Sequence, residues 1–154
     1  MDYFLGVDSG AKGGWAILDK EGNYFIGAAY SSFKQFRDQL LFLSPNFNTR
    51  IFAVLEQVWG RPGQNTKATF NQGHNYGGWQ ATFELLEFPV ELISAVKWQK
   101  NVLGNFPKGK SKEASLAFAT RRWPQLNLKK KDDGLTDALC IAYYARRLHL
   151  GKEI

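Results

Sequence analysis

The sequence has little of the chemistry that holds soft metals or disulfide frameworks. It contains one cysteine, Cys140, and two histidines among 154 residues. A single cysteine excludes a disulfide framework and a thiolate metal site, and it favours a reducing, intracellular setting. No apolar run approaches the length that a membrane-spanning helix needs, and the N-terminus lacks the layout of a signal peptide. We therefore expect no membrane partner.

The composition is that of a folded domain. Hydrophobic residues make up 44% of the chain and aromatic residues 15%, which is too apolar for a disordered protein. The length suits one hydrophobic core, so we expect a single domain over residues 1–154. The net charge of +6, with the excess in the second half, favours a polyanionic partner such as nucleic acid. For any one lysine, a solvated surface position is the alternative.

Apolar patterns predict a mixed, five-stranded α/β sheet flanked by helices. Three strands joined by short glycine-bearing links should form an antiparallel meander; we expect them at residues 3–7, 13–18 and 24–29. Helices and two further strands then alternate, with the first helix ending at Ser44-Pro45-Asn46. The expected helices are 31–43, 66–87, 95–103, 111–122 and 133–148, the expected strands 50–55 and 90–93, and 127–132 is expected to be a basic loop.

Two carboxylates follow predicted buried strands. Asp8 comes after "YFLGV" and Glu56 after "RIFAVL". Functional sites collect at the carboxyl ends of strands in open α/β sheets, so parallel neighbouring strands would bring these two together. Repulsion between them would be offset by a divalent cation. The alternatives are a turn aspartate at position 8 and a surface glutamate at position 56.

The last predicted helix opens with "KKKDDGLTDALCIAYYARR". Asp133 and Asp137 are four residues apart and share a face, and Asp137 lies beside the apolar stripe, where a lone carboxylate is unexpected. Helix capping explains Asp132 or Asp133 but not Asp137. Oxygen ligands from two strand ends and a helix favour Mg²⁺ or Mn²⁺. Two such ions about 4 Å apart would hold the attacking water and leaving oxygen of a phosphodiester in line.

Three stretches carry a family resemblance. "GVDSGAKGGWAIL", "LEQVWG" and "KKKDDGLTDALCIA", in this order, resemble the RuvC-like Holliday junction resolvases, which have the ribonuclease H-like fold. The intervening "GWQATFELLEFPVELISAVKWQKNVLG" and "SKEASLAFATRRWP" are most similar to phage and chloroplast members. The resemblance implies a homodimeric endonuclease that resolves four-way DNA junctions by hydrolysis with two Mg²⁺ or Mn²⁺ ions and no small-molecule cofactor. It also implies an intracellular protein, in the bacterial cytoplasm if phage-encoded.

The resemblance assigns the metal ligands residue by residue. The family's first-strand aspartate matches Asp8 and its fourth-strand glutamate matches Glu56. Its final acidic pair matches Asp137 and Asp133, with Asp132 as a rival for the latter. Bacterial members space this pair by three residues, which would place the earlier acid at the position of a glycine in this chain.

The resemblance also assigns basic and aromatic residues. The lysine near the scissile phosphate matches Lys112, with Lys110 as its rival. Trp59 matches an aromatic residue that acts on junction bases, although it could instead pack against the following helix. A glycine-bearing helix, here 66–87, contributes to the family's dimer, and its Gly73, Gly77 and Gly78 would permit close approach to another helix or to DNA. The predicted DNA-binding residues are Trp59, Arg61, Lys67, Lys100, Lys108, Lys110, Lys112 and Lys130.

Other functions compete with junction resolution. Nucleases of the same fold also cut flaps, forks, single strands and RNA, and a non-cutting branched-DNA binding protein could share the fold. Retention of four acids argues against a mere binder, because a polyanion favours their loss. "GVDSG" also resembles the first phosphate loop of actin-like ATPases and sugar kinases, but those proteins need two such domains around one nucleotide.

Overall fold

The predicted mixed sheet is present, with strand order β3-β2-β1-β4-β5. The structure is a computed structural model that describes residues 1–43 and 50–151. The meander and the parallel half share β1: β1 pairs antiparallel with β2 and parallel with β4, and β4 pairs parallel with β5. The strands are β1 (Tyr3–Asp8), β2 (Gly14–Asp19), β3 (Tyr24–Ala29), β4 (Ile51–Glu56) and β5 (Val90–Ile93).

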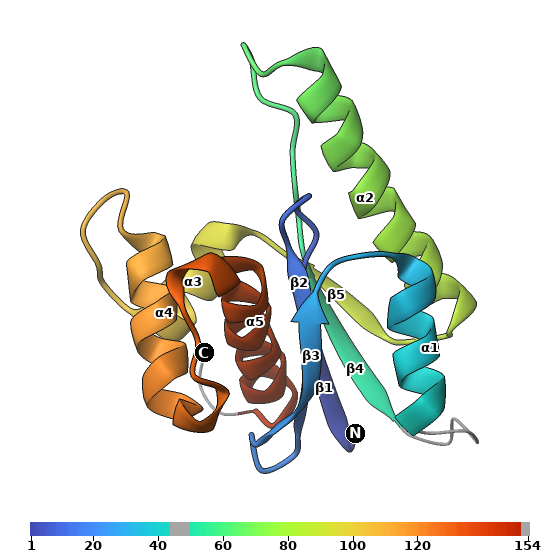
Figure 1. The fold of residues 1–154 in the computed structure, drawn as a ribbon, viewed down its shortest axis with the longest axis vertical. Helices are drawn as coiled ribbons and strands as arrows, with labels where there is room; N and C mark the ends of the chain where they lie inside the picture. Colours follow the sequence, from blue (N-terminus) through green and yellow to red (C-terminus); the bar gives the residue numbers. More distant parts are fainter. Residues whose placement is uncertain (44–49, 152–154) are drawn as a thin grey trace.

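Helices cover both faces of this sheet (Figure 1). α1 (Phe33–Leu43) and α2 (Thr66–Leu85) lie on one face, where Phe36, Trp79 and Phe83 pack on the sheet. The other face carries α3 (Ala95–Leu103), α4 (Ser111–Arg122) and α5 (Asp133–His149), with α5 against the central strands. Two short 3₁₀ turns, at Pro124–Leu126 and Lys130–Asp132, connect α4 to α5. None of the described helices is long and apolar enough to cross a membrane.

The element boundaries agree closely with the sequence prediction. β1, β2 and β4 each end one residue later than expected, because Asp8, Asp19 and Glu56 still pair in the ladders. β2 and β4 also begin one residue later than expected. The expected loop at 127–132 instead contains a 3₁₀ turn at its end. The Ser32 hydroxyl accepts a hydrogen bond from Gln35 N at 3.0 Å and so caps α1. The expected end of that helix at 44–46 lies outside the described residues.

The first half of α2 projects beyond the sheet (Figure 1). Its buried residues, Trp79 and Phe83, both lie in its second half. The three glycines of this helix differ in their surroundings. A Cβ at Gly73 or Gly77 would meet nothing within 4 Å, whereas one at Gly78 would lie 2.4 Å from the Phe33 ring. Gly78 therefore serves packing inside the fold, and only the other two leave the projecting part of the helix open to a partner.

At Gly6, no side chain separates α5 from β1. A Cβ at Gly6 would lie 2.1 Å from the backbone nitrogen of Ala142 and 2.3 Å from the carbonyl oxygen of Ala138. At the start of the helix, a Cβ at Gly134 would lie 2.3 Å from the carbonyl oxygen of Lys12. Backbone atoms cannot rotate away as a flexible side chain can, so these two glycines set the position of α5 along the sheet.

We predict that Gly6→Ala lowers the free energy of unfolding by about 3 kcal/mol, because the added methyl group forces α5 away from β1. Gly73→Ala is the matched control. It adds a methyl group in open space within a helix and should raise the free energy of unfolding by about 0.5–1 kcal/mol. Urea denaturation midpoints at an unchanged m-value measure both effects. An equal, small effect in both variants would contradict the close contact.

Candidate active site

The two strand-end carboxylates meet at one edge of the sheet. Asp8 is the last residue of β1 and Glu56 the last residue of β4, and these strands are parallel neighbours. The backbone N–H of Gly10 donates to Asp8 Oδ1 at 3.0 Å, which orients this carboxylate within the tight link to β2. The Ser9 hydroxyl donates to the carbonyl oxygen of Glu56 at 3.5 Å and so ties the ends of the two strands together.

α5 brings two further carboxylates to this edge. Asp133 and Asp137 lie in its first two turns, next to the helix contact at Gly134. The position of that glycine explains why this chain spaces its acids by four residues. Any side chain at 134 would collide with the backbone of the β1–β2 link, so the position cannot carry a carboxylate without moving the helix.

Burial and like charge raise the pKa of three of the four carboxyl groups. The pKa of Glu56 is raised to about 7, first by burial and then by the charge of Asp8. The pKa of Asp137 is raised to about 6, again by burial first and by Asp8 second. Burial also raises the pKa of Asp8 itself, against the Gly10 hydrogen bond and the charge of Lys112. Mutually repelling, half-buried oxygen donors are a donor set that suits a hard divalent cation.

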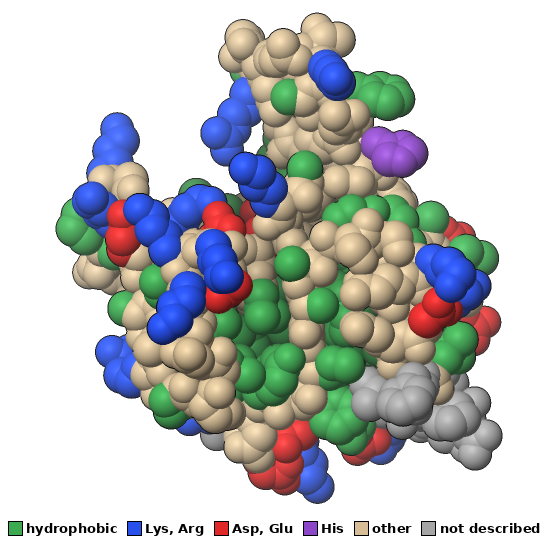
Figure 2. Space-filling view, viewed as in Figure 1, with side chains coloured by type: hydrophobic (Ala, Val, Ile, Leu, Met, Phe, Trp, Pro, Cys, Tyr) green, Lys and Arg blue, Asp and Glu red, His purple; other side chains and the backbone are tan. Residues whose placement is uncertain are grey.

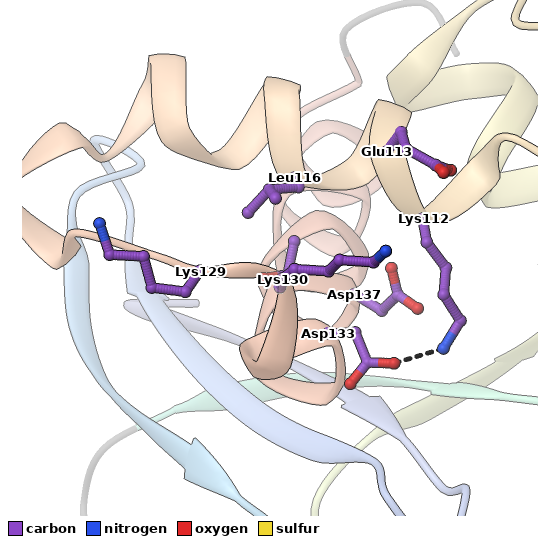
Figure 3. Close-up of a pocket in the computed structure, with 8 residues that line it drawn as sticks. Lys112, Glu113, Leu116, Lys129, Lys130, Asp133 and Asp137 are labelled. Atoms are coloured by element: carbon purple, nitrogen blue, oxygen red, sulfur yellow. Dashed lines mark hydrogen bonds and ion pairs between the residues drawn. The ribbon is translucent and has the colours of Figure 1, made fainter.

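The structure separates Asp133 from its rival Asp132. Asp132 Oδ2 accepts a hydrogen bond from the backbone nitrogen of Lys129 at 2.8 Å, so this carboxylate caps the 3₁₀ turn. Asp133 instead forms an ion pair with Lys112, which lowers the pKa of the aspartate, and it lies beside Asp137 (Figure 3). Asp133 is therefore the residue that α5 places with the other acids.

Lys112 and Lys110, the two candidates for the lysine near the scissile phosphate, also differ in the acid that each one contacts. Lys112 reaches across from α4 to Asp133, whereas Lys110 Nζ lies 3.8 Å from Glu113 Oε1 on the exposed surface. A cavity of about 330 Å³ opens beside the Lys112–Asp133 pair (Figure 3). Its lining residues are Lys112, Glu113, Leu116, Lys129, Lys130, Asp133, Thr136 and Asp137. Asp8 and Glu56 do not line it, so the cavity adjoins the four acids and does not enclose them.

The remaining predicted DNA-binding residues are exposed to solvent. Figure 2 shows Lys and Arg side chains on both sides of an acidic patch, between the α4 side and the base of the projecting α2. Arg61 and Lys67 are exposed near the start of α2, and Lys108 is exposed in the link between α3 and α4. Lys100 lies apart, in a depression of about 500 Å³ that Lys97 and Arg147 also line.

Trp59 does not pack against the following helix. Its side chain is 68% exposed, three residues after Glu56 in the loop that leads to α2. This exposure removes the packing alternative and leaves the aromatic face open to a partner. Sequence reasoning missed Trp98, which is fully buried on α3 and donates its indole N–H to Glu56 Oε2 at 2.5 Å. No sequence signal could reveal that contact, because it joins residues 42 positions apart.

The acids do not form a ready ligand shell. Within residues 1–43 and 50–151, no group of three or more His, Cys, Asp or Glu side chains is placed to hold a metal ion. Glu56 is engaged by Trp98, and Asp133 by Lys112. The chemistry of the donor set nevertheless fits Mg²⁺ or Mn²⁺, because every candidate ligand is a carboxylate and no thiolate or imidazole competes.

Comparisons with known proteins identify the fold. No family model matches the sequence, and no curated protein matches it either. Solved structures do match. The structure of Thermus thermophilus RuvC has a TM-score of 0.63 at 19% identity, over 97% of this chain and 96% of that one. The chain has the ribonuclease H-like fold.

A second match is T. thermophilus RuvC in complex with a Holliday junction substrate. Its TM-score is 0.62 at 15% identity, over 98% of this chain and 97% of that one. The RuvC-like fold thus accounts for nearly the whole chain, as the sequence motifs predicted. Similarity to phage and chloroplast members stays a prediction.

We predict that Asp8→Asn lowers the pKa of both Glu56 and Asp137, because the charge of Asp8 raises both. Both values should stay above those of ordinary carboxyl groups, since burial is the larger cause. Asp133→Asn is the control: it should lower the pKa of Asp137 and leave Glu56 unchanged. Carboxyl ¹³C NMR titrations measure the midpoints. An unshifted Glu56 in the Asp8 variant would show that the two strand ends are not electrostatically coupled.

Proposed function

We propose that this protein is a metal-dependent endonuclease that resolves four-way DNA junctions by hydrolysis of phosphodiester bonds. One observation carries the proposal: Asp8, Glu56 and Asp137 gather at one edge of the sheet, with Asp133 and Lys112 beside them. A buried cluster of like charges destabilises the fold, so its presence calls for a function. The fold shared with junction-bound RuvC supports DNA as the partner.

In this proposal, Asp8, Glu56, Asp133 and Asp137 would hold Mg²⁺ or Mn²⁺, and the bound metal would supply an activated water and positive charge against the phosphate. Lys112 stands beside these acids and supplies positive charge toward the phosphate oxygens in the transition state. Its ion pair with Asp133 keeps the ammonium group in place before DNA arrives.

The surroundings of the acids suit a branched nucleic acid. Lys110, Lys130, Arg61 and Lys67 would contact phosphates on the two sides of the acidic patch, with Lys100 and Lys108 further out. The exposed ring of Trp59 would stack on an unpaired base, an interaction worth about 1–3 kcal/mol. A homodimer with one site per subunit would match the two-fold symmetry of a junction and make paired cuts.

The test is a cleavage assay on the purified protein. Labelled four-way junction, three-way fork, linear duplex and RNA substrates are each incubated with Mg²⁺, Mn²⁺ or EDTA. We expect paired, symmetric nicks in the junction that EDTA abolishes. Equal cutting of fork and junction would replace the proposal with a general branch nuclease, and tight binding without cutting would replace it with a non-cutting DNA-binding protein.

We predict that Asp8→Asn abolishes junction cutting while the fold and junction binding persist, because the substitution removes a ligand charge and keeps the shape. Asp132→Asn is the matched control on the neighbouring turn. Its carboxylate accepts a hydrogen bond from the backbone nitrogen of Lys129 and so caps the 3₁₀ turn. Cutting should therefore continue at a near-normal rate. Gel-based cleavage and binding assays, with circular dichroism for the fold, measure both variants. Normal cutting by Asp8→Asn would refute the site assignment.

Lys112→Ala should lower the cleavage rate by about 10²–10³-fold, the usual effect of losing one group that stabilises transition-state charge. Lys110→Ala removes the same charge two residues away, where the lysine faces Glu113 and not the acids, so its rate should change little. Single-turnover cleavage at saturating protein separates these effects from weaker DNA binding. Equal losses of cleavage rate in both variants would mean that Lys112 only contacts DNA phosphates and does not stabilise the transition state.

A further inference from the structure

We propose that Trp98 is a positioning residue, which holds the Glu56 carboxylate in its metal-binding orientation through the indole N–H. The inference rests on the proposed function, because it gives Glu56 a role as a ligand. The indole Nε1 of Trp98 donates to Glu56 Oε2 at 2.5 Å, and the tryptophan is fully buried. A hydrogen bond to a carboxylate is short and strong, and this one joins α3 to the end of β4.

Trp98 is itself held rigidly. Its ring packs in the hydrophobic cluster between the sheet and α5, with Phe4, Val54, Ile93 and Ile141. Ser94 caps the start of α3, because its hydroxyl accepts a hydrogen bond from the backbone nitrogen of Lys97 at 3.3 Å. A donor held by this packing can hold its acceptor in turn.

The bond leaves part of Glu56 available. An indole has one N–H and engages one carboxylate oxygen, Oε2, so Oε1 would be the oxygen left to contact a metal ion. The carboxylate also lies within electrostatic range of Asp8 and Asp137. Repulsion from these charges would turn an unrestrained glutamate outward, and the indole opposes that rotation.

A buried indole N–H needs some acceptor in any protein, so the bond could serve only to satisfy the donor and not to position Glu56. Trp123 shows what such a bond looks like here. It is also buried, and its Nε1 donates to the carbonyl oxygen of Gly22 at 3.1 Å, in the cluster beneath α4. A backbone carbonyl satisfies the donor without burying a charge. Trp98 instead uses an ionisable side chain at the site, which is the costlier acceptor.

The experiment compares Trp98→Phe with Trp123→Phe, which each remove one buried indole hydrogen bond and keep an aromatic ring. Mg²⁺ is titrated into each protein without DNA, and NMR follows the backbone amide of Gly10, whose N–H donates to Asp8. Trp98→Phe should raise the Mg²⁺ concentration at half-saturation by about 10–100-fold, as is usual when the partner of a metal ligand is lost. Trp123→Phe should leave it unchanged, and urea denaturation of both variants controls for lost stability.

A second measurement needs no core substitution. In the unaltered protein, the indole N–H resonance of Trp98 should move on addition of Mg²⁺ while that of Trp123 stays in place, and Glu56→Gln should abolish the movement. A static Trp98 resonance while the Gly10 amide responds, or equal half-saturation in all three proteins, would overturn the inference. So would the absence of any Mg²⁺ response. A full Mg²⁺ response without DNA cleavage would refute the proposed function and leave the positioning role of Trp98 standing.

Discussion

The close approach of α5 to β1 is the contact on which the rest of this structure depends. At Gly6 the helix backbone of Ala138 and Ala142 comes so near the strand that even a methyl group would not fit. Gly134 does the same between the helix start and the β1–β2 link. With these distances set, the first turns of α5 can only lie over the carboxyl end of β1, and Asp137 must face Asp8.

This arrangement places like charges where they destabilise the folded state. Burial and mutual repulsion raise the pKa of Glu56 to about 7 and of Asp137 to about 6. Fixed donors offset part of the penalty: the Gly10 amide on Asp8, the Trp98 indole on Glu56 and the Lys112 ammonium group on Asp133. The hydrophobic clusters on both faces of the sheet stabilise the frame that holds the acids together.

By contrast, several groups away from the core make few contacts within the chain. The first half of α2 projects from the sheet, Gly73 and Gly77 of this helix face open space, and the ring of Trp59 is exposed in the loop between β4 and α2. Their exposure suits a surface that is completed by a partner, which in our proposal is branched DNA and a second subunit.

Apolar periodicity and glycine-bearing links are local signals, so the sequence predicted the fold class, the element boundaries to within two residues and the acids at the strand ends. It also placed Asp133 and Asp137 on one helix face. Only the tertiary structure distinguishes between candidate site residues that are close together in the sequence. Only the folded chain shows that Asp132 caps a turn while Asp133 meets Lys112, that Lys110 faces Glu113, and that Trp59 is exposed. The bond from Trp98 to Glu56 was equally beyond reach, because it joins distant segments whose meeting depends on how α3 and α5 pack on the sheet.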